Sequence, residues 1–480
     1  MDFQFEKARA AKRFASVFSL AVILTTFGCE QPTTVSNANV SVNAPATNTA
    51  GNSAANTAQN IPEQNKNLAS QMPVTLPVLD AMFSDENFAK DLKSKLQLTD
   101  EQIDKLKNAS RQAVTNLKES DDEGGSTRDS MERAGQQIKE IIGENNAGKF
   151  FNFVRERWSG GDNADNASGS ANNNGASMMN SVPTDTRVVV NAPAYRMDLF
   201  QEGKLVKSYK IGIGYPEFPL PSGMRKANEI IFNPTWTPPD EPWVESSNKV
   251  KAGETVKAGD KLNPLGPIKI PIGLPSLIHG GKNPAKLGTF ASHGCVGLTS
   301  KQVQDFSLDL ANISGTELTK EDVADYGKQK TETKNFKLSK SIPVELRYQT
   351  IVVEDGKLKI FRDVYEKGTN TEENLRKVFE TYGVSFDDLK EQDRQKILAG
   401  LKQMSLDATG NVVESNGNSN TDGKMNSTNS NAIAKTNANN SKTQGEQVTR
   451  AVKGKKEVVF DLAELKGKGY PAPVAMNMGK

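Results

Sequence analysis

The chain has 480 residues, and its charges nearly balance, with 60 Lys and Arg against 58 Asp and Glu. This balance disfavours a nucleic-acid binder that works by counterion release, because such proteins carry a basic excess. The chain has 2 Cys and 2 His, which excludes a disulfide-rich scaffold and a Cys/His zinc cluster. Hydrophobic residues make up 36%, against roughly 45–50% in folded domains when Gly is also counted, so we expect part of the chain not to fold.

Residues 1–29 have the pattern of a secretory signal peptide. Basic side chains come first, and an apolar stretch from Phe14 to Phe27 follows, which is short for a membrane-spanning helix. Its end, Gly28-Cys29, resembles a bacterial lipobox, although Thr26 stands where that motif prefers Leu. The resemblance implies an exported, periplasmic lipoprotein, anchored to the membrane through a lipid on Cys29. The alternative is an ordinary signal peptide, with that Cys removed or left unmodified.

Three segments are rich in small polar residues. Residues 30–72 contain mainly Asn, Thr, Ser, Ala and Gln, and they cannot bury enough apolar surface to offset the entropy of ordering. We predict a disordered tether there, a linker at 159–184 and a second disordered stretch at 411–447. The tail that follows, residues 448–480, has no pattern that assigns it a structure.

Residues 73–158 change to a helical pattern. Thr99 and Gln102 form a capping box, in which each side chain bonds the other residue's backbone, and apolar stripes follow at helical spacing. The segment is predicted to be a helical hairpin. Residues 98–102 resemble the LTxxQ motif of periplasmic stress chaperones of the Spy type, which would imply a chaperone-like or sensor module with protein partners that remain unknown. The simpler alternative is a capped helix and nothing more.

From residue 185 the apolar residues alternate with period two, which indicates strands. Turn residues at 202–203 and 355–356 predict two β-hairpins, and a capping box at Thr299 predicts a helix between them. We therefore predict a β-rich domain with a few short helices over 185–367. A separate helical segment is predicted at 371–404.

The only two His, His279 and His293, lie in the same short segment as Cys295, the one Cys outside the predicted signal. A thiol attacks carbonyl groups as thiolate, and an imidazole can take its proton. Gly294 permits a tight turn whose backbone amides could form an oxyanion hole, and Gly280 permits close backbone approach. A structural Cys with two incidental His is the alternative. No metal or cofactor is implied.

The wider segment spells HGxxxPxxxGxxxSHGC, and it resembles the active-site signature of YkuD-type L,D-transpeptidases. Other stretches agree with that family in the same order along the chain. They are residues 187–191, 219–223, 233–239, 263–266 and 363–365. The resemblance covers 185–367 and implies a YkuD-like β-sandwich as the catalytic domain, with the helical segments and linkers outside it.

The resemblance also implies roles for individual residues. Cys295 would be the nucleophile, and His279 the general base, held by a backbone carbonyl near Gly280. Ser292 and His293 would line the donor site, with amides from Gly294 and Cys295. The residues alone do not decide which His is the base.

One departure from the family concerns Gly297, which stands where an Arg or Asn is usual after Ser-His-Gly-Cys-Val. The family's reaction is transfer of a peptidoglycan tetrapeptide stem to an amine of a neighbouring stem, with release of D-Ala and formation of a 3-3 cross-link. Transfer to water would make the chain an L,D-carboxypeptidase, and transfer to a protein amine would make it a wall-anchoring enzyme. The missing side chain at 297 favours a further alternative, a non-catalytic lipoprotein that binds peptidoglycan.

Overall fold

The computed structural model describes residues 71–115, 117, 126–160, 180–238, 250–251, 253–273, 275–406, 452 and 454–476. The predicted signal with Cys29, nearly all of the tether at 30–72, most of the linker at 159–184 and the stretch at 411–447 lie outside the described residues, so those predictions stay predictions. Within the described ranges, no helix is both long and apolar enough to cross a membrane.

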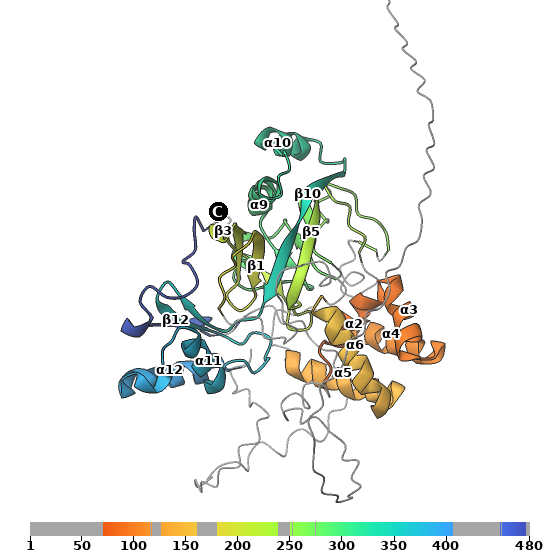
Figure 1. Cartoon of the computed structure of the whole chain (residues 1–480). Helices are drawn as coiled ribbons and strands as arrows, with labels where there is room; N and C mark the ends of the chain where they lie inside the picture. Colours follow the sequence, from red (N-terminus) through yellow and green to blue (C-terminus); the bar gives the residue numbers. More distant parts are fainter. Residues whose placement is uncertain are drawn as a thin grey trace, which may run out of the picture. The chain divides into compact units, whose positions relative to one another are not determined.

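The largest sheet has eight strands (Figure 1). In spatial order they are β3 (Lys204–Lys210), β2 (Arg196–Gln201), β1 (Arg187–Asn191), β10 (Lys334–Arg347), β5 (Gly223–Phe232), β6 (Ile268–Pro271), β7 (Leu277–His279) and β9 (Val296–Gly297). The long strand β10 runs parallel to β1 and antiparallel to β5, and it joins the two halves of the sheet. The hairpin predicted at 202–203 is confirmed, with β2 and β3 antiparallel and φ positive at both turn residues.

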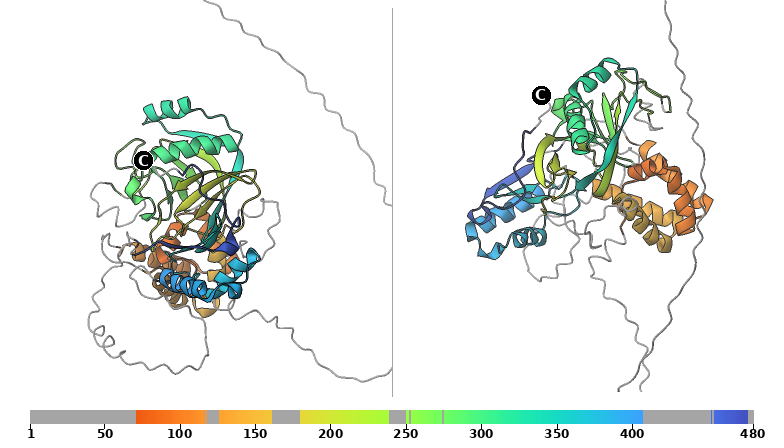
Figure 2. Two further views of the ribbon diagram at one scale, coloured as in Figure 1. Left: turned by 90° about the vertical axis from the view of Figure 1, so that its left-hand side faces the viewer. Right: turned by 45° about the horizontal axis from the view of Figure 1, so that its top comes forward.

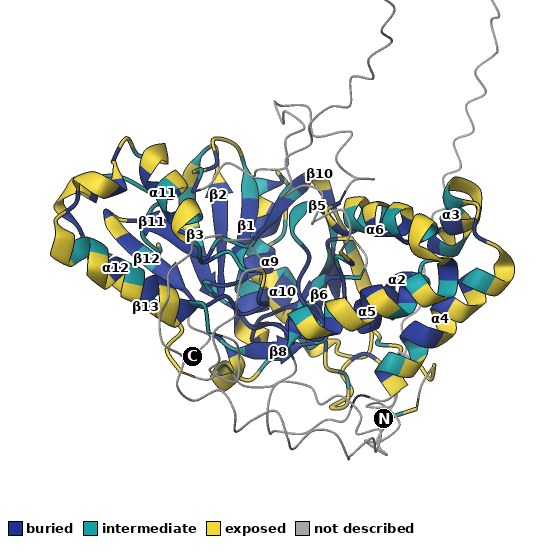
Figure 3. Cartoon of the chain, turned by 90° about the horizontal axis from the view of Figure 1, so that it is seen from below, coloured by how far each residue is buried: buried dark blue, intermediate teal, exposed yellow. Residues whose placement is uncertain are grey.

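The predicted β-rich domain is confirmed, and one helix packs on its sheet. Helix α9 (Ser300–Ile313) begins at Thr299 with the predicted capping box, and it contacts β6. Its Phe306 packs edge-on against Tyr209 of β3, with 5.5 Å between the ring centroids. Figure 2 shows α9 beside the sheet, and Figure 3 shows that the strands it covers are largely buried. Shorter elements complete this domain: β4 (Ile213–Gly214), η1 (Pro284–Lys286), β8 (Phe290–Ser292) and α10 (Lys320–Lys328).

The region before the sheet contains more helices than the predicted hairpin. They are α2 (Leu76–Phe83), α3 (Glu86–Leu96), α4 (Asp100–Thr115), α5 (Thr127–Ile142) and α6 (Glu144–Trp158). We call residues 71–160 the helical region. Its core is its own, with Phe88, Phe150 and Phe151 fully buried. The predicted capping box at the start of α4 is confirmed, since the Thr99 amide donates to Gln102 Oε1 (3.0 Å) and the Gln102 amide to Thr99 Oγ1 (3.2 Å).

The hairpin predicted at 355–356 forms, but outside the eight-stranded sheet. One of its faces lies in a third core, and the other packs against Val189 and Phe200 of the eight-stranded sheet. Its strands pair with a strand from the unassigned tail, and two helices cover them. The elements are β11 (Ile351–Glu354), β12 (Lys357–Phe361), α11 (Glu372–Thr381), η2 (Phe386–Asp388), α12 (Glu391–Met404), β13 (Glu457–Asp461) and η3 (Ala463–Leu465). We call these elements, with the residues up to 476, the C-terminal region.

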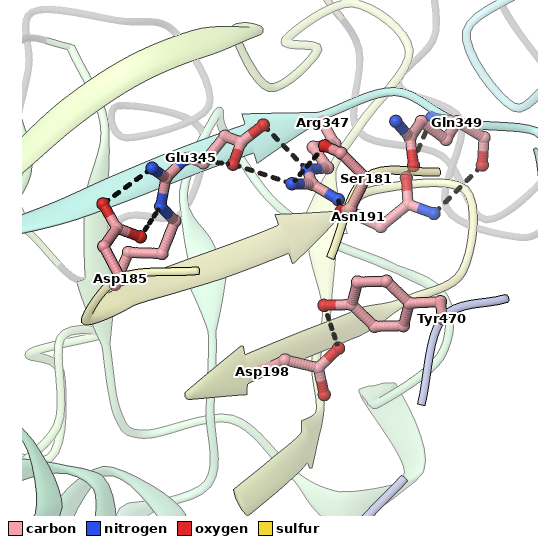
Figure 4. Close-up of polar contacts among 9 residues, drawn as sticks. Ser181, Asp185, Asn191, Asp198, Glu345, Arg347, Gln349 and Tyr470 are labelled. Atoms are coloured by element: carbon pink, nitrogen blue, oxygen red, sulfur yellow. Dashed lines mark hydrogen bonds and ion pairs between the residues drawn. The ribbon is translucent and has the colours of Figure 1, made fainter. Parts of the chain in front are cut away.

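Polar contacts hold the ends of β1 and β10 and attach the C-terminal region (Figure 4). The Asn191 side chain makes two hydrogen bonds to the backbone of Gln349, as a paired strand residue would. It accepts from the Gln349 amide (2.9 Å) and donates to the Gln349 carbonyl (3.0 Å). Arg347 binds Glu345 on the same strand and the Ser181 carbonyl. The Tyr470 hydroxyl donates to Asp198 of β2 (3.1 Å), so the tail is hydrogen-bonded to the eight-stranded sheet.

Candidate active site

The predicted base lies on a strand whose parallel neighbour begins directly after the predicted nucleophile. The register between β7 and β9 pairs Ile278 with Val296 and His279 with Gly297. Cys295 directly precedes β9, and a backbone hydrogen bond with Leu277 acts on its thiol. Because side chains alternate along a strand, Cys295 and Gly297 share the face on which His279 lies.

The Ser292 side chain closes the turn before β9. Its hydroxyl donates to the Cys295 carbonyl (2.6 Å) and accepts from the Cys295 amide (3.0 Å). On the other side of the turn, Ser276 Oγ donates to the Gly294 carbonyl (2.9 Å), and Gly294 itself has φ +90°. The Cys295 amide is therefore already engaged, which differs from the expectation that it serves an oxyanion.

His279 is buried, and its ring contacts the backbone of Gly280 and of Leu265. The Gly280 contact indicates the tautomer. Nδ1 lies 2.8 Å from the Gly280 carbonyl oxygen, and a carbonyl can only accept, so Nδ1 carries the proton and Nε2 is left as a proton acceptor. The Gly280 amide in turn donates to the Ile268 carbonyl (3.1 Å). This bond fixes Gly280, whose carbonyl orients the imidazole ring of His279. Burial lowers the pKa of His279 to about 3, with Lys282 adding to the effect. The imidazole is consequently neutral at neutral pH.

Cys295 is a half-buried residue. Burial raises the pKa of the Cys295 thiol. A backbone hydrogen bond with Leu277 and the positive charge of Lys282 both oppose that rise. A neutral thiol beside a neutral imidazole is thus the resting state of the pair. Such a pair needs proton transfer at the moment of attack.

His293 faces a loop that carries aromatic residues. Its ring packs edge-on against Tyr215, with 5.1 Å between centroids, and against Phe218, with 4.8 Å. The rings of residues 215–218 therefore orient His293 as part of one wall of the site.

That same loop is held from the other side by the helical region. Thr75 Oγ1 donates to the Glu217 carbonyl (2.6 Å), and Thr127 Oγ1 donates to the Pro216 carbonyl (2.8 Å). Both Thr side chains are buried and lie at the beginnings of α2 and α5. The sequence does not predict these contacts, because each joins residues that lie far apart along the chain.

The end of the helical region meets the eight-stranded sheet just beyond the loop. Arg225 of β5 donates to the Trp158 carbonyl. Gly223 has φ +107°, and a Cβ there would lie 2.0 Å from the Ser159 carbonyl oxygen, so the approach of the two segments requires glycine. The turn at 219–223, noted in the sequence for its family resemblance, is therefore also a docking point.

Lys282 is a site residue that the sequence analysis missed. A Cβ built on Gly297 would lie 2.9 Å from Lys282 Cγ and 3.1 Å from its Cε. The lysine side chain therefore occupies the space that a side chain at 297 would fill. The signal was present in the sequence as the unusual Gly297, but only the strand register connects it with a residue in the preceding loop.

A family model matches part of the chain. Residues 185–310 match the model of the YkuD family, the L,D-transpeptidase catalytic domain. The match falls on the region whose motifs predict that family. No curated protein shows a significant match to the chain.

Solved structures of L,D-transpeptidases are also similar to part of the chain. The Ldtfm–avibactam carbamoyl enzyme is 16% identical over 34% of this chain and 49% of its own, with a TM-score of 0.22. The catalytic domain from the E. faecium L,D-transpeptidase is 15% identical over 35% of this chain and 100% of its own, with a TM-score of 0.22. An L,D-transpeptidase from Mycobacterium smegmatis is 12% identical over 34% of this chain and 58% of its own, with a TM-score of 0.20. The chain thus spans about half the length of the first and third of these proteins.

Proposed function

We propose that the protein is a peptidoglycan L,D-transpeptidase that uses Cys295 as its nucleophile. The observation that carries the proposal is a neutral His279, fixed by the Gly280 carbonyl through Nδ1, on the strand that pairs with the one following Cys295. This arrangement gives a thiol and a proton acceptor with the correct free nitrogen. The substrate class comes from the catalytic-domain match over 185–310.

The proposed first half-reaction forms a thioester. His279 Nε2 takes the Cys295 proton as the sulfur attacks the carbonyl carbon before the terminal D-residue of a tetrapeptide stem. The tetrahedral intermediate then collapses, the C–N bond breaks, and the imidazolium returns its proton to the leaving D-Ala amine. The low pKa of His279 makes the imidazolium a strong acid for this second proton transfer.

In the second half-reaction the side-chain amine of a neighbouring stem attacks the thioester. The amine loses a proton to His279, the C–S bond breaks, and Cys295 regains its proton, which leaves a 3-3 cross-link. Because the Cys295 amide bonds Ser292, we assign the oxyanion to the Gly294 amide. Water or a protein amine as acceptor would use the same steps and give a carboxypeptidase or an anchoring enzyme.

The non-catalytic alternative is weakened by the occupied space at Gly297. Its main support was the loss of a polar side chain at that position, and Lys282 lies there instead. We also propose that the protein is exported and anchored through a lipid on Cys29. Labelling of cells with a fatty-acid analogue tests the anchor, because the native chain should take up label and a Cys29→Ser chain should not.

Intact-mass spectrometry with a carbapenem tests the proposed function, since this inhibitor class acylates the nucleophilic Cys of the family. The chain from residue 30 onward should gain one carbapenem mass, and Cys295→Ala should gain none. Iodoacetamide at alkaline pH serves as the control for access to the thiol. A native chain that reacts with iodoacetamide but forms no carbapenem adduct would contradict the proposal.

A further inference from the structure

We propose that Lys282 is the electrostatic partner of the nucleophile, with its ammonium group reaching across Gly297 to stabilise the Cys295 thiolate. The inference rests on the proposed function, because it concerns the form of Cys295 that attacks. It goes beyond that function by assigning a role to a lysine of the loop that follows His279.

The backbone holds Lys282 beside the strand that carries the nucleophile. Its amide donates to the Leu298 carbonyl (3.0 Å), and the Leu298 amide donates to the His279 carbonyl (2.8 Å). These bonds continue the β7–β9 pairing beyond its last paired residues. Lys282 therefore starts next to Gly297, and its side chain runs over that residue.

Gly297 makes this path possible. The Lys282 stem lies over it so closely that even an Ala methyl group would meet Cγ at 2.9 Å and Cε at 3.1 Å. Gly297 is also the residue opposite His279 in the strand register, two positions after Cys295. The stem thus crosses the face that carries the thiol and the imidazole.

Among the described residues, the electrostatic effects on this face come from Lys282, Cys295 and His279. The Lys282 charge lowers the pKa of both Cys295 and His279, and the Cys295 charge in turn raises the pKa of Lys282. Burial lowers the pKa of Lys282, and no carboxylate forms an ion pair with it in the described part of the chain. Lys282 is half-buried. A partly desolvated ammonium without a carboxylate is costly, and a thiolate beside it removes part of that cost.

The chemical consequence is a preference for one protonation state. A positive charge near both groups lowers the pKa of Cys295 and of His279, so it favours a thiolate beside a neutral imidazole. On titration the thiol proton goes to solvent. In the proposed reaction it goes to His279, and Lys282 then keeps the imidazolium ready to return it to the leaving amine.

The pH dependence of alkylation tests this role without any need for turnover. In this reaction the thiolate displaces iodide from iodoacetamide, and its rate follows the thiolate fraction. Lys282→Met keeps the length of the stem and removes the charge, Lys282→Arg keeps the charge, and Lys286→Met removes an exposed lysine from the same loop as the matched control. Circular dichroism on each variant confirms that it is folded.

We expect Lys282→Met to raise the apparent pKa of the thiol by about one unit or more, which is about a tenfold slower alkylation at a fixed neutral pH. Lys282→Arg and Lys286→Met should keep the native profile. An unchanged profile in Lys282→Met would overturn the proposal. If its profile is unchanged but transfer from stem peptides falls, Lys282 acts on the donor and the thiolate role is again overturned. Absence of transpeptidation in the native chain, with the pKa shift intact, would instead reject the proposed function.

Discussion

The helical region and the C-terminal region are both built around cores of their own, but they contact different parts of the catalytic domain. The helical region donates two hydrogen bonds to the loop whose rings orient His293. The C-terminal region contacts the β3 side of the sheet, where the Ser208 amide donates to the Val474 carbonyl and Tyr470 binds Asp198 of β2. It also reaches the Gly288 carbonyl through Lys456. The comparison separates a region that holds the loop beside His293 from one that mainly pairs with the edge of the sheet.

The largest test of this comparison removes one core phenylalanine from each region. Phe150 and Phe379 are both fully buried, in the helical and C-terminal cores respectively. Phe→Ala at either position should cost about 3–5 kcal/mol of stability. We expect the thermal loss of Cys295 acylation by a carbapenem to move to lower temperature in Phe150→Ala, because the helices release the 215–218 loop as they unfold.

Phe379→Ala is the matched variant for that experiment. Its C-terminal region should unfold early, as followed by limited proteolysis, while acylation of Cys295 persists. Equal loss of acylation in both variants would show that the two regions support the site equally, and the comparison would fail.

The next largest effect is a pH dependence of stability that comes from His279 in the site, and from neither of the two regions. The pKa of His279 is lowered to about 3 in the folded protein, against about 6.5 when unfolded, so the unfolded chain binds the additional proton between these values. The stability that this contributes is complete above about pH 6.5 and is lost as the pH falls, by roughly 2–3 kcal/mol at pH 4.5. Denaturant unfolding at pH 7.5 and 4.5 measures the loss.

His279→Gln is the reference for the pH experiment, because Gln does not titrate. Its stability should fall less between the two pH values than that of the native protein. Equal losses would place the titration elsewhere and would show that His279 is not held neutral by burial.

A smaller effect comes from single hydroxyl groups at the two attachments. Thr127→Val removes the donor to the Pro216 carbonyl without changing the shape of the side chain. A buried carbonyl left without its partner costs about 1–3 kcal/mol, and we expect a few-fold slower acylation of Cys295 as the loop loosens. Stopped-flow measurement with a chromogenic β-lactam gives the rate.

Tyr470→Phe is the counterpart on the C-terminal side, since it removes the hydroxyl that donates to Asp198. It should lower stability by a similar amount and leave the acylation rate as in the native protein. A slower rate in this variant, equal to that of Thr127→Val, would mean that the edge of the sheet is coupled to the site.

The smallest effect concerns Thr99, the cap of α4. Its capping box is a local stabiliser, so Thr99→Ala should cost about 1 kcal/mol and should not change acylation of Cys295. Thermal unfolding and the acylation rate together check this. An unchanged stability would remove the structural explanation of the motif at 98–102 and favour the chaperone-like alternative.

Local signals in the sequence predicted much of the fold, and contacts between distant residues account for the rest. Both capping boxes and both hairpin turns depend on residues within three or four positions of one another, and all four are present. Strand β13 could not be predicted, because its partner β12 lies on the far side of a long low-complexity stretch. The number of helices before residue 160 was also missed, since only two of their apolar stripes were clear in the sequence.

In the candidate site, too, local signals in the sequence predicted some features, and others depend on contacts between distant residues. The rare Cys and His residues and their spacing indicated the pair, and the structure has His279 Nδ1 on the Gly280 carbonyl, as the family resemblance implies. Two features needed the fold. The engagement of the Cys295 amide depends on how Ser292 turns, and the place of Lys282 depends on a strand register that sets it over Gly297.

The pairing of β13 with β12 has a consequence for the order of events as the chain emerges. β11, β12 and both covering helices leave a ribosome or an export channel well before β13 does, and domains that emerge first generally fold first. The edge of β12 that β13 covers therefore waits, unpaired, until the intervening low-complexity stretch has emerged. During that interval the emerging chain presents a template for another strand, and the delay itself becomes a point at which misassembly competes with folding.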